Sequence, residues 1–291
     1  MNDKQKVLVF GEVLFDCFSA GEQVLGGAPF NVAWHLQALG HQPQFISRVG
    51  EDELGEEIKA AMTLWGMNKT ALQIDPIHPT GQVQINLING EPQYTITPDC
   101  AYDFIAADEF SNLPETGILY HGSLGLRNKV SRNALMQLAR KPELSIFLDV
   151  NLRSPWWQKE QLHEWIKQAR WVKLNLDELQ KLGYCSKDIK QEMSNFQTQY
   201  QLDLLIVTRG EAGAIVRSDD GAFNTLTPEP VTDIVDTVGA GDAFSAVFIH
   251  GLVSGWSVNH TLEIAQQFAS QVVGLRGATS TDPAFYQDFI N

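Results

Sequence analysis

The segment 236–242, Asp-Thr-Val-Gly-Ala-Gly-Asp, has the residue types of an anion-binding site with a base beside it. Gly239, Ala240 and Gly241 have little or no side chain, so an anion can closely approach their backbone N–H groups. The apolar stretch that follows predicts a helix, whose first turn offers unpaired donors and a positive dipole end. Asp242 stands at that helix start. The segment therefore indicates phosphoryl transfer to a hydroxyl with Asp242 as base, or, in the simpler alternative, a helix-capping Asp.

A second glycine pair, Gly26 and Gly27, precedes a predicted helix that begins at Asn31. Glycine lets the backbone approach a ligand closely, and the Asn31 amide offers both a donor and an acceptor. Asp16, just beyond the first predicted strand, can accept two hydroxyl hydrogens from one sugar. Taken alone, Asp16 is better explained as a turn residue and Asn31 as a helix cap.

Polar residues also follow the apolar run 145–150. If the strand continues, Asp149, Asn151 and Arg153 share one of its faces. The planar guanidinium of Arg153 suits an oxyanion, so we expect Arg153 to hold the transferred phosphate or the sugar, with Asn151 beside it.

The elements that must position these residues alternate between short apolar runs and helical patterns, which predicts a mostly parallel sheet covered by helices on both faces. In such sheets, ligands bind beyond the carboxyl ends of the strands, where these motifs fall. The predicted strands are 7–13, 44–49, 118–121, 145–150, 171–174 and 204–207, and the predicted helices are 31–39, 52–64, 131–139, 161–169 and 187–199.

One region departs from this alternation. Residues 82–88 and 93–97 alternate polar and apolar side chains, and the residues between them, 89–92, are typical of a hairpin turn. Because a two-stranded ribbon is marginal alone, we expect it to join other strands as a lid over the sugar. The alternative is an ordinary edge hairpin on the main sheet.

Composition narrows the class of protein. The 291 residues, 44% of them hydrophobic, can form one large core. The net charge of −14 argues against a nucleic-acid partner, which would need stripes of Lys and Arg. The polar N-terminus, the absence of an 18-residue apolar run, and three widely spaced cysteines predict a soluble, cytoplasmic protein without a membrane partner.

The two glycine segments, 26–40 and 236–242, resemble in order and separation the two signatures of the ribokinase-like (PfkB) carbohydrate kinases. Shorter pieces at 11–16, 149–153, 175–178, 208–213 and 277–278 extend the resemblance over nearly the whole chain. It implies one α/β domain, 1–291, with a small β lid formed by approximately 12–25 and 82–104. It also implies a kinase that uses ATP and Mg²⁺, and in many members K⁺.

The resemblance assigns roles to individual residues. Asp242 would be the general base, and the amides of 239–242 would hold the transferring phosphate. Asp16, Gly27 and Asn31 would contact the sugar. Asn175 and Glu178, an N-x-x-E pair, would position Mg²⁺ and phosphates, with Glu178 acting through water. For that pair the alternative is a capping arrangement at a helix start.

The nucleotide side is implied in the same way. Thr208, Gly210 and Gly213 are similar to the turn that holds the nucleotide phosphates, together with Gly241. The stretch 266–279 resembles the helix and loop beside adenine. Asp236, with backbone carbonyls near it, would be a candidate for the monovalent-cation site.

The glycine motif is most similar to that of bacterial fructokinases, so we expect a small, neutral sugar, fructose first. Other kinase substrates stay open: 2-keto-3-deoxygluconate, ribose or tagatose. A catalytically silent sugar- or nucleotide-binding regulator is a further alternative. A dinucleotide-dependent oxidoreductase is disfavoured because the first strand lacks G-x-G-x-x-G. A lid with exposed strand edges could also pair two copies into a homodimer.

Overall fold

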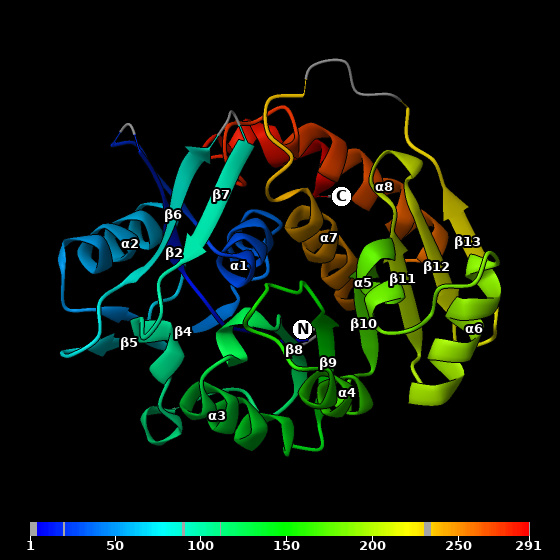
Figure 1. Ribbon diagram of the computed structural model, residues 1–291, viewed down its shortest axis with the longest axis horizontal. Helices are drawn as coiled ribbons and strands as arrows, with labels where there is room; N and C mark the ends of the chain where they lie inside the picture. The colour runs from blue at the N-terminus through cyan, green and yellow to red at the C-terminus, as the bar shows by residue number, and fades with distance from the viewer. Residues whose placement is uncertain (1–4, 20, 89–90, 111, 230–233, 291) are drawn as a thin grey trace.

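The computed structural model describes residues 5–19, 21–88, 91–110, 112–229 and 234–290 (Figure 1). Nine strands of these residues form one sheet, in the order β13-β12-β11-β10-β9-β8-β1-β4-β5. Neighbours from β11 to β5 run parallel, while β12 and β13 are antiparallel. The strands are β1 (Val7–Phe10), β4 (Gln44–Gly50), β5 (Leu72–Asp75), β8 (Gly117–His121), β9 (Leu144–Asp149), β10 (Trp171–Asn175), β11 (Leu204–Thr208), β12 (Ala214–Ser218) and β13 (Phe223–Leu226).

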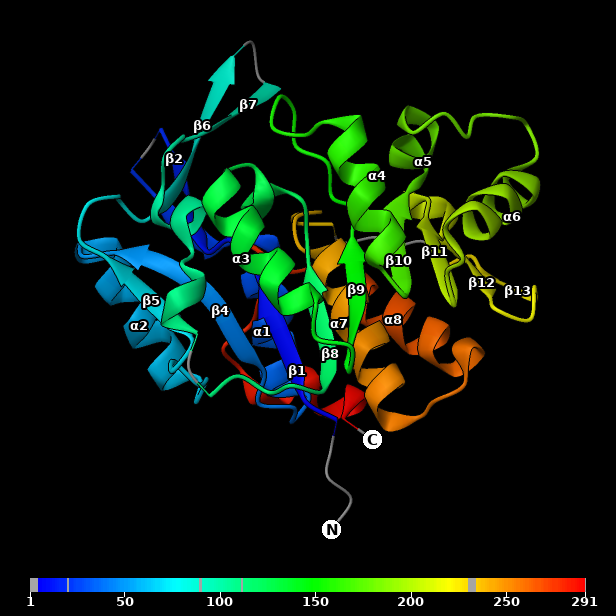
Figure 2. The same ribbon diagram turned by 90° about the horizontal axis from the view of Figure 1, so that it is seen from below.

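Helices cover both faces of this sheet, as the two views in Figures 1 and 2 show. Side chains alternate between the faces: Val7 and Val9 pack into one core, and Leu8 and Phe10 into the other. The first core is covered by α1 (Ala28–Ala38), α2 (Glu53–Leu64), α7 (Ala240–Ser254) and α8 (Val258–Val272). The second is covered by α3 (Lys129–Ala139), α4 (Lys159–Gln168), α5 (Leu176–Lys181) and α6 (Ile189–Tyr200). The predicted α/β class is confirmed.

A second sheet stands apart from the first (Figure 1). Its described strands follow the order β3-β2-β6-β7, with β2 and β6 parallel. The expected hairpin pairs β6 with β7, and residues 89–90 of its turn lie outside the described residues. A small apolar core that includes Leu14, Val83 and Tyr102 lies against this sheet. The strands are β2 (Leu14–Phe18), β3 (Gln23–Gly26), β6 (Gly81–Ile88) and β7 (Glu91–Ile96).

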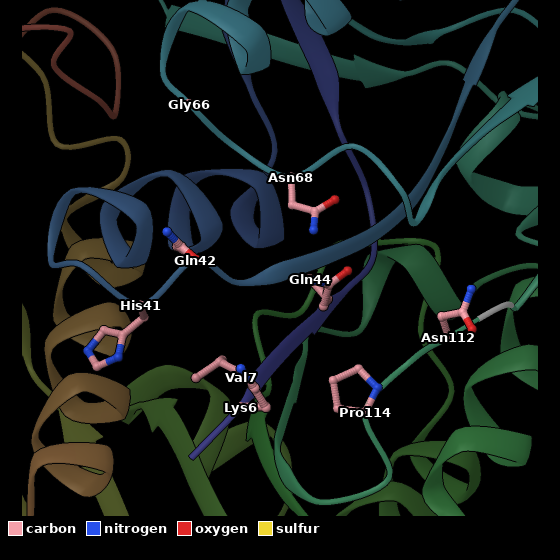
Figure 3. A pocket seen from close by; sticks show the side chains of 9 residues that line it. All are labelled: Lys6, Val7, His41, Gln42, Gln44, Gly66, Asn68, Asn112 and Pro114. Atoms are coloured by element: carbon pink, nitrogen blue, oxygen red, sulfur yellow. The ribbon is translucent and has the colours of Figure 1, made fainter. Parts of the chain in front are cut away.

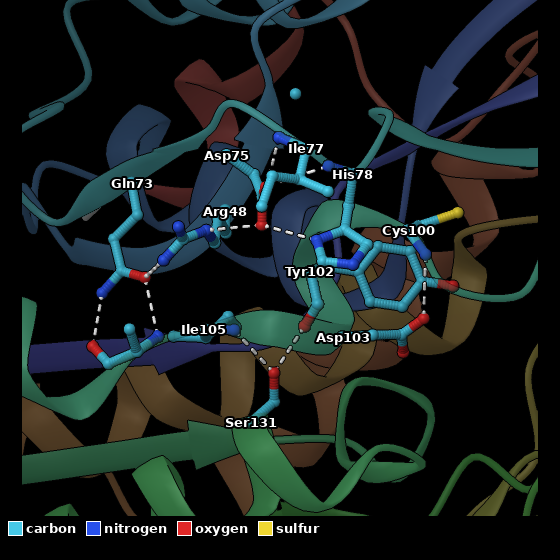
Figure 4. Close-up of polar contacts among 12 residues, drawn as sticks. Arg48, Gln73, Asp75, Ile77, His78, Cys100, Tyr102, Asp103, Ile105 and Ser131 are labelled. Atoms are coloured by element: carbon cyan, nitrogen blue, oxygen red, sulfur yellow. Dashed lines mark hydrogen bonds and ion pairs between the residues drawn. The ribbon is translucent and has the colours of Figure 1, made fainter.

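Polar contacts tie the edge of the main sheet to the segment that follows the hairpin (Figure 4). Arg48 on β4 forms an ion pair with Asp75 on β5 at 2.9 Å. Gln73 exchanges two hydrogen bonds with the backbone of Ala106, and Ser131 on α3 accepts from Ile105 N–H and donates to Tyr102 C=O. The short 3₁₀ helices are η1 (Ala101–Phe104), η2 (Ala107–Glu109), η3 (Leu124–Leu126), η4 (Gly210–Ala212) and η5 (Pro283–Phe289).

Several predicted boundaries differ from the observed ones; the first strand, predicted at 7–13, ends at Phe10. Asp149, Asn151 and Arg153 would share a face only if the strand predicted at 145–150 continued, and β9 ends at Asp149. Val150 N–H still donates to Lys173 C=O, and Asn151 then takes a φ of 39°, which turns the chain out of the sheet. The alternation of a strand therefore does not extend to Arg153. Within the described residues, no helix is long and apolar enough to span a bilayer.

Candidate active site

The N-terminal turns of α1 and α7 meet where the two glycine motifs begin. Asn31 Nδ2 donates a 2.8 Å hydrogen bond to Asp242 Oδ2, joining residues 211 positions apart in the chain. Asn31 is 3% exposed, and its Oδ1 has no hydrogen-bond partner among the residues that the structure describes. A buried acceptor without a partner is costly unless a ligand or water satisfies it. The amide therefore presents a free acceptor beside the candidate base.

The turn before α7 requires glycine. Gly239 caps the helix with a φ of 83° and a ψ of −13°, and Ala240 is the first helical residue. A Cβ on Gly239 would lie 2.3 Å from Ala278 Cβ, so the chain can pass here only without a side chain. Since the first N–H groups of a helix have no intrahelical acceptor, the amides of 239–242 could receive an anion, and their role in binding phosphate stays a prediction.

Removal from water raises the pKa of Asp242 to about 6. The hydrogen bond from Asn31 lowers the pKa, as do the charges of Lys173 and Arg153, while Asp149 raises it. A carboxylate with a pKa near 6 is largely ionised at pH 7 and still basic enough to accept a proton. The electrostatics suit a general base.

A buried ion pair, which the sequence analysis did not identify, adjoins residues 239–241, the turn that we call the anion-binding turn. Lys173 Nζ on β10 lies 2.7 Å from Asp149 Oδ2 at the end of β9, and both side chains are buried. Asp149 Oδ2 also accepts from Ser245 Oγ at 2.8 Å. A Cβ on Gly241 would lie 3.4 Å from Lys173 Nζ, so this ammonium adjoins the turn. A lysine inside the apolar strand was the signal that could have revealed it.

The side-chain oxygens of Asp16 and Asn31 flank Gly26, and we call these three residues the Gly26 site. A Cβ on Gly26 would lie 3.8 Å from Asp16 Oδ2 and 3.9 Å from Asn31 Oδ1, so these two acceptors flank one point in space. Gly27 has a φ of 109°, and a Cβ there would meet Glu12 C=O at 2.7 Å. The glycines thus let β3 turn into α1 while leaving room beside the two acceptors. Asp16, Gly26, Gly27 and Asn31 come together as predicted.

Burial changes the pKa of two carboxyl groups near the Gly26 site. Burial raises the pKa of Asp16 to about 6 and the pKa of Glu12 to about 7. Arg153 is exposed, and its positive charge partly offsets both shifts and that of Asp242. Sequence reasoning missed Glu12, which is 3% exposed and accepts from Gly125 N–H through Oε2 at 3.1 Å. The charge of Arg153 therefore acts on all three carboxyl groups, although β9 ends before it.

Asn151, which we expected beside Arg153 at the phosphate or sugar, lies in the turn after β9. Its side chain is partly buried, and its C=O accepts from Ser123 Oγ at 3.0 Å, which fixes the turn after β9.

Asn175 and Glu178 form the capping arrangement that was the alternative for them. Asn175 Oδ1 accepts from Glu178 N–H at 2.9 Å, and Glu178 Oε2 accepts from Asn175 N–H at 2.9 Å. Glu178 Oε1 accepts from Leu152 N–H at 2.7 Å. Each carboxylate oxygen keeps a second lone pair, so the group still fits a metal-bound water.

The nucleotide-side residues lie next to this cap. Thr208, at the end of β11, is the register partner of Asn175 on β10. Gly210 follows with a φ of 57°, and Gly213, at 78°, leaves no room for a side chain because its Cβ would lie 2.0 Å from Leu226 C=O. The turn therefore lies at the carboxyl edge of the sheet, beside the end of β10.

Asp236 binds the backbone. Its Oδ1 accepts from Val238 N–H at 3.0 Å and its Oδ2 from Gly277 N–H at 3.4 Å. Across the described ranges, no three His, Cys, Asp or Glu side chains converge in a way that could hold a metal ion. A cation here would need backbone carbonyls as ligands, and the site at Asp236 stays a prediction.

A separate hollow of about 560 Å³ lies at the other end of the strands (Figure 3). Lys6 and Val7 at the start of β1, and Gln44 at the start of β4, contribute to its wall. Since ligands of parallel sheets bind beyond the carboxyl ends, this hollow is not the site that the motifs form.

Comparison with known proteins supports the motif assignment. Residues 4–284 match the family model described as "pfkB family carbohydrate kinase". A fructokinase of Salmonella typhimurium is 29% identical, covering 98% of each chain. An aminoimidazole riboside kinase of Salmonella typhimurium (strain LT2) is 28% identical, covering 84% of this chain and 80% of the relative. A fructokinase double mutant of Vibrio cholerae O395, solved with fructose, ADP and potassium ion, superposes with a TM-score of 0.86 at 22% identity, covering 99% of each chain. The ribokinase-like fold is thereby confirmed.

Proposed function

This chain belongs to the pfkB family of carbohydrate kinases, and we propose that it transfers the γ-phosphoryl group of ATP to a hydroxyl of a small neutral sugar, fructose first. The observation that carries the proposal is the hydrogen bond between Asn31 and Asp242. Through this bond, the candidate base is linked to the Gly26 site, and it lies on α7 just after the turn at Gly239.

In this proposal, the Gly26 site contacts the sugar. Asp16 accepts hydroxyl hydrogens, and the free Oδ1 of Asn31 accepts another. The glycines let the ring lie against the backbone. Asn31 thus holds the sugar with one amide atom and the base with the other, which aligns the reacting hydroxyl with Asp242.

Asp242 accepts the proton of that hydroxyl as it attacks phosphorus. The amides of 239–242 bind the oxygens of the transferring group, and the Lys173 ammonium beside Gly241 adds positive potential to a protein with a net charge of −14. Because phosphoryl transfer passes through a loose transition state, positioning and charge stabilisation contribute more than the strength of the base.

The remaining predicted residues take the nucleotide and ions. Thr208, Gly210 and Gly213 form the turn for its phosphates. Asn175 and Glu178 would hold a hydrated Mg²⁺, which neutralises phosphate charge when bound. Asp236, with neighbouring carbonyls, would hold K⁺. Three free cysteines are consistent with the reducing cytoplasm, where we place the enzyme.

The second sheet would act as a lid that excludes water during transfer. Its outer strands β3 and β7 have no further strand partner among the described residues, and Tyr94 on β7 is 59% exposed. These edges could join two copies into a homodimer, which sedimentation of the purified protein would reveal.

The carboxyl groups near the Gly26 site favour a neutral substrate over an anionic one. An acidic sugar would need an arginine to pair with its carboxylate. Arg127 donates instead from Nε and Nη2 to Asp103 at 2.7 Å each and from Nη2 to Thr97 C=O at 2.6 Å. These bonds engage it within the protein. The charge of Arg153 already acts on the carboxyl groups of Glu12, Asp16 and Asp242, which would weaken its attraction for an anionic sugar. A sugar phosphate would need a larger cluster of cations.

The test is ADP release from Mg-ATP with fructose, ribose, 2-keto-3-deoxygluconate, tagatose, fructose 6-phosphate and adenosine in turn. We expect fructose to stimulate most strongly. Stimulation by a different compound would replace fructose as the substrate and keep the kinase. If ATP binds and no compound stimulates, the kinase proposal fails and a silent sugar- or nucleotide-binding regulator takes its place.

A further inference from the structure

An aromatic cluster at the C-terminus reaches the anion-binding turn through one loop, 276–280. Tyr286 on η5 is 1% exposed, and its hydroxyl accepts from Ser280 N–H at 3.2 Å and lies 3.2 Å from Ser280 C=O. Trp34 Nε1 on α1 donates to the same C=O at 2.9 Å. His35, next along α1, lies with Nδ1 3.3 Å from the Tyr286 hydroxyl. The end of the loop is therefore fixed from two elements.

The indole of Trp34 is itself held in place. It stacks on Trp65 with ring centroids 5.0 Å apart and an interplanar angle of 5°. Trp65 Nε1 in turn donates to Trp34 C=O at 3.1 Å. Because α1 also carries Asn31 one turn earlier, the helix that holds the base also holds the loop.

The middle of the loop contacts both halves of the site. On one side, Ala278 fills the space that a side chain on Gly239 would need, with Cβ 2.3 Å from that position. On the other side, a Cβ on Gly277 would lie 3.0 Å from Val24 Cγ1 on β3 of the second sheet. Arg276 also forms an ion pair with Glu22 beside β3. One short segment thus touches the anion-binding turn and the sheet that carries Asp16.

We propose that Tyr286 is a positioning residue that, with Trp34, holds loop 276–280 between Gly239 and the second sheet, so that sugar and nucleotide strengthen each other's binding. This rests on the proposed function, because it needs a sugar at the second sheet and a phosphate at the turn. If the sugar orders the second sheet, Val24 and Glu22 order the loop, and Ala278 then fixes Gly239 before the nucleotide arrives. Such coupling must be reciprocal.

The test compares the dissociation constant of ADP with and without saturating fructose, by calorimetry, in the unchanged protein and in two variants. Tyr286→Phe removes the hydroxyl and keeps the ring, whose centroid lies 5.7 Å from that of Phe268. Tyr200→Phe is the matched control, because it also removes a hydroxyl from a buried tyrosine. Tyr200 is the last residue of α6, and its hydroxyl contacts His163 on α4.

We expect fructose to tighten ADP binding about 5-fold or more in the unchanged protein, the usual lower range of coupling. Tyr286→Phe should reduce that ratio about 3-fold or more, the effect of one or two lost hydrogen bonds, while Tyr200→Phe leaves it unchanged. A ratio equal in both variants, or absent from the unchanged protein, overturns the proposal.

Thermal unfolding and ADP release keep the outcome interpretable. If both variants unfold at matched temperatures, a lost ratio in Tyr286→Phe reflects positioning rather than global destabilisation. Should Tyr286→Phe unfold early, Trp34→Phe takes its place with the same expected ratio, because it removes the indole donor to Ser280, together with part of the ring that stacks on Trp65. Failure of the proposed function is a different result: no sugar then stimulates ADP release in the unchanged protein.

Discussion

Gly239→Ala perturbs the anion-binding turn by one methyl group. The residue has a φ of 83° and caps α7, and the added Cβ would lie 2.3 Å from Ala278 Cβ and 2.6 Å from Ala278 Cα. A left-handed conformation costs alanine about 1–2 kcal/mol. Overpacking costs about 1–3 kcal/mol more, because backbone atoms of Ala278 must move. The free energy of unfolding should therefore fall by about 2–5 kcal/mol.

The other end of the same helix provides the control. Gly255 caps α7 with a φ of 70°, and a Cβ there would meet no atom within 4 Å. Gly255→Ala therefore bears only the backbone cost of about 1–2 kcal/mol. Activity separates the two further, because displaced amides at Gly239 should lower kcat about 100-fold or more, as loss of one oxyanion donor does.

Urea unfolding measures the stability of both variants, and sugar-dependent ADP release measures their turnover. The reasoning is refuted if Gly239→Ala and Gly255→Ala lose equal stability. It is also refuted if Gly239→Ala keeps kcat within about 3-fold of the unchanged protein, because the turn would then not need its observed geometry.

Three more predictions follow from the buried charges. Because burial raises the pKa of Asp242 to about 6, kcat/KM should be flat above that pH and fall about tenfold per unit below it, measured as a pH profile of ADP release. Burial also raises the pKa of Glu12 to about 7 and the pKa of Asp16 to about 6. Between their unfolded pKa values near 4 and these folded values, the native state binds more protons than the unfolded state. The free energy of unfolding, measured by urea titration, should therefore rise as the pH is lowered from 7.5 to about 5.5, and the rise should be smaller in Glu12→Gln. A flat profile contradicts this. Lys173→Met leaves Asp149 buried without its cation and should destabilise the protein by about 3–5 kcal/mol, whereas adding Asp149→Asn should restore most of that stability but not turnover.

Local patterns in the sequence predicted the scaffold. Val7 to Phe10 are apolar throughout because the strand is buried on both faces, and the observed cores take alternate side chains. Gly239 and Gly27 were predicted to allow close approach, and both occupy positive-φ positions where a Cβ would collide. Such requirements are encoded in a few adjacent residues, which is why they can be read from one sequence.

Contacts between distant segments could not be predicted in the same way. The pairing of Lys173 with Asp149 depends on β9 and β10 being neighbours, and the pattern of either strand alone does not reveal a partner. Glu12 is buried where it accepts a hydrogen bond from Gly125, which is 113 residues away in the chain. Asn151 leaves the strand direction at a φ of 39°, a local turn that alternation of side chains cannot signal.

The central claim is that Asp242 is the general base, and the most direct measurement is the turnover of Asp242→Asn. An amide can still accept the hydrogen bond from Asn31, so the fold and the affinity for ADP should persist. The account predicts that kcat for sugar-dependent ADP release falls by about 10²–10⁴ while the dissociation constant of ADP changes by less than about 3-fold. A variant that turns over at a near-normal rate would contradict the account.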